Sequence, residues 1–343
     1  TLALDLELQQ LAVQRLGSES GAAVVLDIET GEVLAMASTP AYDPTAFNRG
    51  LTTDEWKALT SDPKAPLANK AIAGQYAPGS TFKPVVALAA LQHGVITPAT
   101  RVFCPGDFRV GTSVFHCWKR RGHGSLALRE AITQSCDCYF YEAARRVGVD
   151  KIAAMGKRLG LGAPLGIDLP HERGGFLPTQ AWKAAKGKGW STGETVITGI
   201  GQGYVLATPL QLAMLAARIA NGREAPVPRL VRDAAAAERI GMREEADDLG
   251  LDPSHLKVVR DGMNAVVNGA GGTAKGAAIR IPGMEMAGKT GTSQVRRISL
   301  SERQSGVIKN EHLPWERRDH ALFIGYAPVA APRYAVAVVI EHG

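Results

Sequence analysis

The chain has 343 residues, 45% of them hydrophobic and 21% charged, and 39 Lys and Arg against 33 Asp and Glu give a net charge of +6. These proportions are ordinary for a globular protein with a substantial core, in one large domain or two smaller ones. The basic residues are scattered without an aromatic platform or a known binding motif, so no nucleic-acid partner is expected. No apolar run reaches the roughly 18 residues of a membrane span.

The first third of the chain predicts a hairpin followed by a helix. Residues 22–28 and 33–38 are rich in β-forming residues, and the short segment 29–32 between them contains a glycine that suits a tight turn. Apolar spacing and glycine or asparagine stops then predict helices. These helices span residues 80–92, 126–147, 210–221 and 256–267.

The last sixty residues predict strands again, at 284–292, 322–326 and 334–341. Strands at both ends of the chain with helices between them predict an α+β fold, in which the two chain ends build one antiparallel sheet and the middle forms a helical subdomain. Two long segments, 171–193 and 296–318, lack a periodic pattern, and such loops are functional lids or disordered segments.

Three short motifs follow one another along the chain. Ser80-Thr81-Phe82-Lys83 places a hydroxyl and an amine one helical turn apart, close enough to touch. A serine needs a neighbouring base because its own pKa leaves it a poor nucleophile, so the pair predicts covalent catalysis. Ser135-Cys136-Asp137 and Lys289-Thr290-Gly291-Thr292 come after it.

In this order the motifs are the signature of penicillin-binding proteins and related β-lactamases. The chain resembles the transpeptidase domain of class B penicillin-binding proteins, within them the penicillin-binding protein 2 branch of the elongation machinery. The second motif reads Ser-x-Asp where most of the wider family has Ser-x-Asn, as in that branch. The likeness extends over nearly the whole chain, at residues 5–9, 27–38, 76–84, 199–211 and 287–295.

The resemblance implies a penicillin-binding-protein/β-lactamase-like fold and a role for each motif residue. Ser80 would attack a D-Ala-D-Ala carbonyl, with Lys83 as general base and Ser135 relaying the proton toward the leaving amine. Lys289 would lie across the cleft and help to lower the pKa of Lys83. Asp137, Thr290, Gly291 and Thr292 would bind substrate, and the backbone N–H groups of Ser80 and Thr292 would form the oxyanion hole.

A rival motif overlaps the third one. Residues 283–290 match the phosphate-binding pattern G-x-x-x-x-G-K-[ST] letter for letter. That pattern requires a helix to open at its end, whereas the segment that follows Thr290 is poor helix material, and the alternating Met284 and Met286 favour a strand. Nucleotide binding is therefore the weaker interpretation.

The four cysteines all fall between the first motif and Cys138, the residue that directly follows the second motif. Cys104, Cys117, His123 and Cys136 form a Cys₃His set, the composition of a closed structural zinc site. Cys138 is then the spare thiol, because residues two apart on a helix point to different faces. Two alternatives stay open, namely disulfide bonds and buried free thiols with His123 an ordinary surface residue.

The resemblance also implies a setting. The 343 residues would be a single transpeptidase domain on the periplasmic side of the inner membrane, with a membrane anchor and a pedestal domain outside this sequence. Its partners would be peptidoglycan stem peptides, β-lactams and a membrane glycosyltransferase of the SEDS family. The alternatives are a carboxypeptidase or β-lactamase of the same fold, and a β-lactam-sensing module without turnover.

Overall fold

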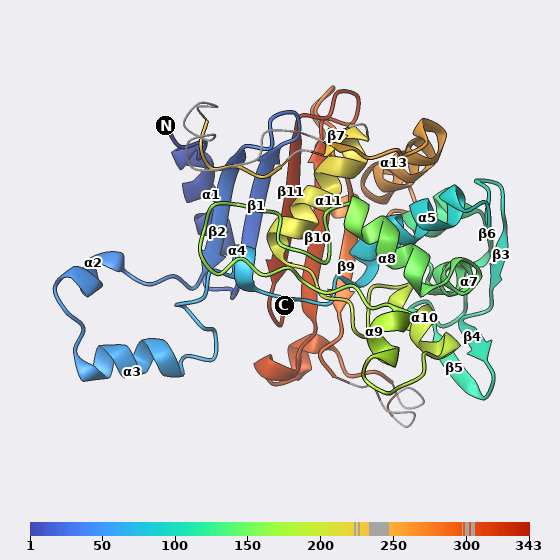
Figure 1. Cartoon of the computed structure of the whole chain (residues 1–343), viewed down its shortest axis with the longest axis horizontal. Coiled ribbons are helices and arrows are strands. Elements are labelled where there is room, and N and C mark those ends of the chain that lie inside the picture. The colour runs from blue at the N-terminus through green and yellow to red at the C-terminus, as the bar shows by residue number, and fades with distance from the viewer. Residues whose placement is uncertain (223, 226, 233–246, 297, 299–301, 303–305) are drawn as a thin grey trace.

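The computed structural model describes the whole chain except residues 223, 226, 233–246, 297, 299–301 and 303–305. Five antiparallel strands form the central sheet (Figure 1). Their order is β2 (Val33–Thr39), β1 (Gly21–Asp27), β11 (Tyr334–Ile340), β10 (His320–Ala327) and β9 (Ala287–Ser293). Strand β1 pairs with β11, with Gly21 opposite Ile340, so the two ends of the chain are joined in one sheet.

Helices cover both faces of the sheet and fill the middle of the chain. They are α1 (Leu6–Leu16), α2 (Pro44–Asn48), α3 (Thr53–Ser61), α4 (Lys70–Ala73), α5 (Lys83–Gln92), α6 (Leu128–Thr133), α7 (Asp137–Val147), α8 (Val149–Arg158), α9 (Gln180–Ala184), α10 (Thr192–Thr198), α11 (Pro209–Asn221) and α13 (Pro253–Asn268). Short 3₁₀ turns are η1 (Gly79–Phe82), η2 (Lys275–Ala277), η3 (Asn310–His312) and η4 (Trp315–Arg317).

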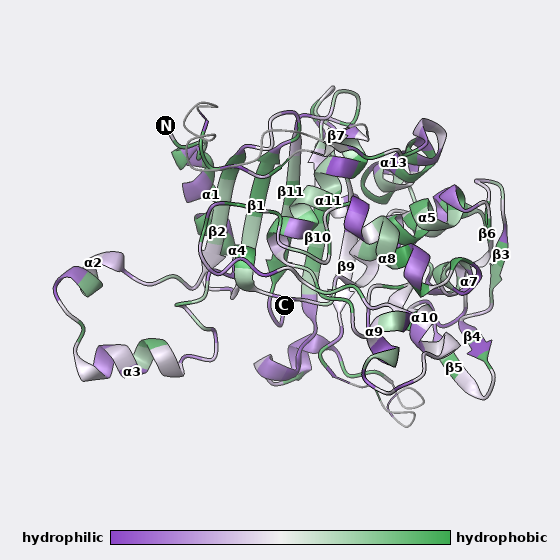
Figure 2. Cartoon of the chain, in the orientation of Figure 1, coloured by the Kyte–Doolittle hydropathy of each residue, from purple (hydrophilic) through white to green (hydrophobic). Residues whose placement is uncertain are grey.

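The two faces of the sheet are buried by different helices. Side chains alternate between the faces of a strand, so Ala22, Val24 and Leu26 of β1 enter the main core, which contains α11. Ala23, between them, packs with Leu16 of α1 in a smaller cluster on the other face. Figure 2 shows the hydrophobic colour concentrated along these strands. This alternation explains why the predicted hairpin of residues 22–28 and 33–38 formed.

The predicted α+β fold is confirmed, with three differences in its elements. The predicted helix 126–147 is wrong, because it is interrupted between α6 and α7, where Ser135 has a φ of 53°. The predicted helix at residue 80 begins as the 3₁₀ turn η1, and α5 starts only at Lys83. The predicted strand from residue 284 begins at Ala287. Elsewhere the helices near 210–221 and 256–267 formed as α11 and α13.

The two long segments also differ from expectation. Residues 171–193 contain α9 and the first turn of α10, because Thr179 and Ser191 cap those helices. In 296–318, positions 297, 299–301 and 303–305 lie outside the described residues, and the remainder includes η3 and η4.

Small strand pairs occur where no element was predicted, except that β6 ends at Leu126, the first residue of the predicted helix 126–147. They are β3 (Val102–Cys104) with β6 (Gly124–Leu126), β4 (Asp107–Val110) with β5 (Ser113–His116), and β7 (Glu224–Ala225) with β8 (Asp247–Asp248). The helices α2 and α3 lie on an extension that leaves the body of the molecule beside β2 (Figure 1), and neither has a buried residue. Within the part of the chain that the structure describes, no helix has the length and apolar character needed to cross a membrane.

Candidate active site

Ser80 lies in η1, which packs directly against the edge of the sheet. The N–H of Gly79 donates to the carbonyl of Gly201 at 2.8 Å, and Thr81 Oγ1 donates to the carbonyl of Pro78 at 2.7 Å. Gly79 has a φ of 54°, and a Cβ placed on it would lie 2.2 Å from the carbonyl oxygen of Thr292. The missing side chain at Gly79 therefore allows η1 and β9 to approach closely, which brings Ser80 beside the third motif.

Lys83 connects the first motif to the second. Its side chain is fully buried at the start of α5, and its ammonium makes three hydrogen bonds. They go to the carbonyl of Ser135 at 2.8 Å, to Ser135 Oγ at 3.1 Å and to Asp137 Oδ1 at 2.7 Å. An ammonium has three donors, so these bonds account for all of them. Ser80, which is partly exposed, stands one turn before this amine.

Ser135 lies at the break between α6 and α7, where the left-handed backbone turns its side chain toward both lysines. Its Oγ accepts a hydrogen bond from Lys289 Nζ at 2.9 Å in addition to the one from Lys83. The serine is 6% exposed. A hydroxyl held between two amines is a geometry suited to passing a proton from one to the other.

Lys289 projects from β9 into the same interior and is fully buried. Burial lowers its pKa well below the ordinary value, the positive charge of Lys83 lowers it further, and the carboxylate of Asp137 opposes the shift. The charge of Lys83 thus acts on the pKa of Lys289, and the expected effect of Lys289 on Lys83 stays a prediction.

The Asp137 carboxylate joins the motif to a tryptophan that the sequence reading missed. Oδ2 accepts from the backbone N–H of Trp118 at 2.9 Å, and the Trp118 indole N–H donates to the carbonyl of Ser135 at 3.1 Å. The residue Trp118 as a whole is 59% exposed. The only signal for Trp118 in the sequence is its neighbour Cys117, which was a candidate zinc ligand.

The outer part of β9 carries the proposed substrate-binding residues. Thr290 Oγ1 is 2.8 Å from Thr273 Oγ1, and the carbonyl of Thr292 accepts a hydrogen bond from Gln202 Nε2 at 2.8 Å. A Cβ on Gly291 would lie 2.7 Å from Thr81 Cγ2, so this glycine also permits close packing against η1. Gln202 belongs to the glycine-rich segment 199–203, part of the region 199–211 that carries the family likeness.

The structure of β9 tests the phosphate-binding interpretation of residues 283–290. Residues 287–293 form a continuous strand paired with β10, and no helix opens after Thr290 in this described segment. The nucleotide-binding interpretation is therefore wrong.

The candidate zinc ligands converge. Possible ligand atoms of Cys104, Cys117, His123 and Cys136 all lie within 4.8 Å of one another, and the three thiols are buried. Nδ1 of His123 is 3.6 Å from Cys104 Sγ and 3.5 Å from Cys117 Sγ. Three sulfurs and an imidazole nitrogen that converge in this way fit a tetrahedral metal site.

The spare thiol has a different role. Cys138 donates to the carbonyl of Asp107 at 3.3 Å, and all four thiols are free, so the disulfide alternative is not what the structure has.

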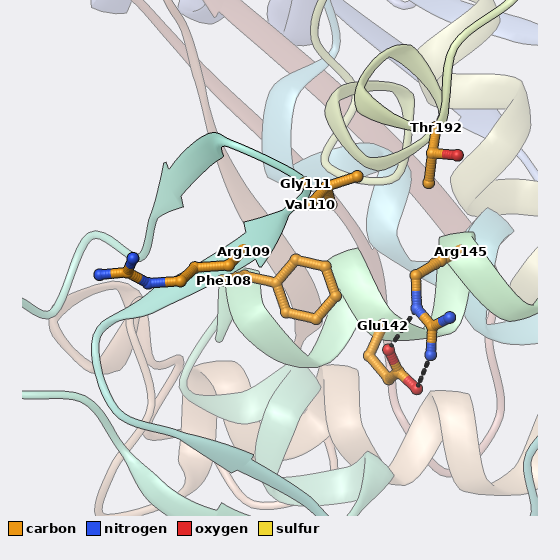
Figure 3. Close-up of a pocket in the computed structure, with 7 residues that line it drawn as sticks. All are labelled: Phe108, Arg109, Val110, Gly111, Glu142, Arg145 and Thr192. Atoms are coloured by element: carbon orange, nitrogen blue, oxygen red, sulfur yellow. Dashed lines mark hydrogen bonds and ion pairs between the residues drawn. The ribbon is translucent and has the colours of Figure 1, made fainter.

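One cavity of about 440 Å³ lies away from these residues, between the β4–β5 hairpin and helices α7 and α10 (Figure 3). Arg145 and Glu142 face each other in it and are joined by two hydrogen bonds, while Arg109 points away from them. None of the candidate catalytic residues lines this cavity.

Residues 21–343 match the family model of the penicillin binding protein transpeptidase domain. The chain belongs to this family. As a penicillin-binding protein transpeptidase domain it is 38% identical, over 349 aligned residues, to the peptidoglycan D,D-transpeptidase MrdA of Acinetobacter baumannii. That alignment covers 100% of this chain and 51% of the relative. The MrdA of Escherichia coli is also 38% identical, with 100% and 54% covered. The transpeptidase domain thus spans about half the length of the curated relatives it matches.

Solved structures of the family share its fold. The Pseudomonas aeruginosa PBP2 in complex with WCK 5153 superposes with a TM-score of 0.87 at 38% identity, covering 100% of this chain and 73% of that one. The Helicobacter pylori PBP2 in a complex with MreC gives 0.88 at 33% identity, covering 100% and 60%. The resemblance to the penicillin-binding protein 2 branch is therefore confirmed.

Proposed function

We propose that this domain is a serine D,D-transpeptidase that forms peptide cross-links in peptidoglycan and that β-lactams acylate. The observation that carries the proposal is the position of Ser135 Oγ, 3.1 Å from Lys83 Nζ and 2.9 Å from Lys289 Nζ, next to the turn that holds Ser80. The relatives named D,D-transpeptidase MrdA support the same activity.

In the proposed reaction, Ser80 Oγ attacks the carbonyl carbon of a D-Ala-D-Ala bond. Lys83 acts as general base after its ammonium has given up a proton, and the N–H groups of Ser80 and Thr292 hold the oxyanion. The C–N bond then breaks as Ser135 gives its proton to the leaving amine and takes from Lys83 the proton that came from Ser80, so D-alanine departs and an acyl-enzyme remains. The hydroxyls of Thr290 and Thr292 would bind the substrate carboxylate.

The second half-reaction distinguishes the alternatives. An amine from a neighbouring stem peptide attacks the acyl-enzyme and gives a cross-link, whereas water gives carboxypeptidase activity. A class A β-lactamase needs a deacylating glutamate, and no Glu-x-x-Leu-Asn segment occurs between Ser135 and Lys289. The transpeptidase is therefore favoured over the hydrolase.

The test is a two-part assay. Intact mass after incubation with penicillin is expected to show one stable adduct, and incubation with a stem pentapeptide and an acceptor amine is expected to release D-alanine and give the cross-linked product. Rapid turnover of penicillin would identify a β-lactamase, release of D-alanine without cross-linking a carboxypeptidase, and an adduct without any D-alanine release a sensing module.

We also propose that Cys104, Cys117, His123 and Cys136 hold a structural zinc ion. The convergence of their ligand atoms, with His123 Nδ1 3.6 and 3.5 Å from the sulfurs of Cys104 and Cys117, supports a site completed by a metal. A closed set of four protein ligands stabilises the fold and leaves no position for a reacting water. Metal analysis of protein purified without added zinc tests this assignment.

The setting is proposed from the relatives. We infer that residues 1–343 act as one transpeptidase domain with a sheet subdomain and a helical subdomain, on the periplasmic side of the inner membrane. The proposed partner is a SEDS-family glycosyltransferase, and one similar structure, 33% identical with a TM-score of 0.83, comes from a peptidoglycan synthase complex. Co-purification with the glycosyltransferase from membranes tests the partnership.

A further inference from the structure

The outer edge of β9 is occupied by side chains of the domain itself. β9 is the last strand in the order of the central sheet, so one of its edges faces away from β10. The carbonyls of Thr290 and Thr292, two residues apart, belong to the same edge, because successive residues of a strand turn their N–H and C=O groups to opposite sides. Lys289 Nζ donates to the first at 3.0 Å and Gln202 Nε2 to the second at 2.8 Å. The backbone groups of an edge strand are otherwise open to an added extended peptide.

The proposed oxyanion hole determines how a peptide added antiparallel to β9 would lie. The carbonyl that Ser80 attacks accepts a hydrogen bond from the N–H of Thr292. In an antiparallel hydrogen-bonded pair, the two opposed residues exchange both of their N–H to O=C bonds. The substrate residue whose carbonyl is held by the Thr292 N–H therefore donates its own N–H to the Thr292 carbonyl. That residue is the penultimate D-alanine of the stem peptide, and the acylamino N–H of a penicillin is its counterpart.

Gln202 holds this acceptor in the free domain. Its side-chain amide donates to the Thr292 carbonyl oxygen, as the substrate amide would. The other side of the oxygen is covered by η1, since a Cβ placed on Gly79 would lie only 2.2 Å from it. A second N–H therefore finds room at this oxygen only where the Gln202 amide lies. The substrate and Gln202 compete for one acceptor.

The side chain of Gln202 can move while its backbone stays in place. The N–H of Gly201 donates to the carbonyl of Thr198 at 2.9 Å, and that of Gln202 donates to the carbonyl of Ile197 at 3.2 Å. The Gln202 side chain is partly exposed, and residues 203 and 204 after it are exposed. Rotation of the side chain into solvent therefore breaks the bond to Thr292 and leaves the turn intact.

We propose that Gln202 is a gate residue of the peptide site, which closes the edge of β9 until a ligand with an amide N–H takes its place at the Thr292 carbonyl. This inference rests on the proposed function, since it concerns the peptide substrate of the same site. A ligand that brings its own N–H replaces the bond that Gln202 gives up, whereas a bulky ligand without one leaves the carbonyl unpaired. Gln202 thus acts on specificity in the binding step, before Ser80 attacks.

The test compares two lactams on the wild type and on the variants Gln202→Ala and Gln202→Met. Benzylpenicillin carries an acylamino N–H beside the lactam carbonyl, whereas imipenem has only hydrogen on that face of the same ring carbon. The dependence of acylation on lactam concentration separates the Kd of the non-covalent complex from the acylation rate constant. Since neither variant has an amide to displace, we expect the Kd of benzylpenicillin to fall about fivefold, with an unchanged rate constant. For imipenem, both constants should equal those of the wild type.

A crystal structure of the benzylpenicillin acyl-enzyme gives a second readout. We expect Gln202 Nε2 to lie more than about 3.5 Å from the Thr292 carbonyl oxygen in it, beyond hydrogen-bond distance. Gln10→Met, at an exposed position of α1, is the matched control and should react with both lactams as the wild type does.

Three results would overturn the inference. They are a benzylpenicillin Kd that stays equal or rises in the Gln202 variants, an equal fall in the Kd of imipenem, and a Gln202–Thr292 bond that persists in the acyl-enzyme. Any of these in a wild-type domain that both lactams acylate would leave the proposed function standing and remove this inference alone. A wild-type domain that neither lactam acylates would overturn the proposed function and this inference with it.

Discussion

Lys289 Nζ donates a hydrogen bond to Ser135 Oγ at 2.9 Å, although the two residues are 154 positions apart in the chain. One comes from an edge strand of the sheet and the other from the break between two helices, so the bond joins the two parts of the fold. Both side chains are buried, and the contact therefore depends on how sheet and helices pack.

The first prediction concerns the nucleophile. Ser80→Ala removes the hydroxyl that forms the ester, so we expect no mass adduct with penicillin. Because Ser80 Oγ is partly exposed, the free energy of unfolding should change by no more than about 0.5 kcal/mol. Ser113→Ala, at an exposed position of β5, is the control and should acylate normally. An adduct on the Ser80 variant would place the nucleophile elsewhere.

The second prediction follows from the pKa of Lys289, which burial and then Lys83 lower from 10.5. Between the lowered pKa and 10.5, the unfolded chain binds more protons than the folded chain, so this group makes stability rise with pH. Lys289→Met removes that contribution. Stability of the wild type should therefore rise relative to that of the variant as pH rises from about 7 to about 10. The free energy of unfolding of the variant minus that of the wild type should fall over this range.

Urea denaturation at several pH values measures this difference. Lys151→Met, an exposed lysine on α8, is the control, and its difference from the wild type should stay constant. A Lys289→Met difference that is equally flat would show that the amine keeps its ordinary pKa.

The third prediction tests the contact between η1 and β9. Gly79→Ala places a Cβ 2.2 Å from the Thr292 carbonyl oxygen at a φ of 54°, and we expect a loss of about 2–4 kcal/mol of stability. Gly94→Ala is a matched control, because Gly94 has a φ of 63° with open space around it, and it should cost about 1 kcal/mol from the backbone alone. Equal losses, measured by chemical denaturation, would mean that the close approach is unimportant.

The fourth prediction separates the proposed zinc ligands from the spare thiol. Cys136→Ser should lower both zinc content and melting temperature, since loss of one of four ligands weakens a structural site. Cys138→Ser, at an equally buried position two residues away, should retain the metal. Plasma mass spectrometry and thermal melting provide the readouts. Unchanged zinc in the Cys136 variant, or equal loss in both, would contradict the assignment.

The fifth prediction concerns Trp118 as a positioning residue. Trp118→Phe keeps a ring beside His123 but removes the indole N–H that donates to the carbonyl of Ser135. The net value of one such bond is about 1 kcal/mol, so we expect the penicillin acylation rate to fall about fivefold. The pH profile of acylation should also shift, because the Ser135–Asp137 segment that holds Lys83 moves. Trp56→Phe, at an exposed position of α3, is the control. An unchanged acylation rate and pH profile in Trp118→Phe would contradict a positioning role for Trp118.

Much of the site could be predicted because its chemistry is written in short local patterns. Ser80 and Lys83 are three residues apart, which places them one helical turn from each other. Residues 289–292 belong to a segment whose own sequence predicts a strand. The runs of β-forming residues in β1, β2 and β11 likewise identify the sheet, because β-branched side chains favour extended backbone whatever the packing around them.

Other residues were beyond a local reading. Ser135 has a left-handed backbone inside the segment 126–147, which was predicted as one continuous helix, and at this break its side chain meets Lys83 and Lys289. Trp118 and Gln202 reach the site through hydrogen bonds across 17 to 90 positions, which no pattern in their own segments indicates.

By itself, then, the sequence determined the family, the order of the strands and helices, and the groups that carry the chemistry, because periodicity and motif spacing act over a few residues. The tertiary structure alone decided that two lysines share one serine, that three thiols and an imidazole meet, and that Gln202 reaches the carbonyl of Thr292. Those arrangements depend on packing between distant segments, where burial and shape, and no local pattern, select the contact.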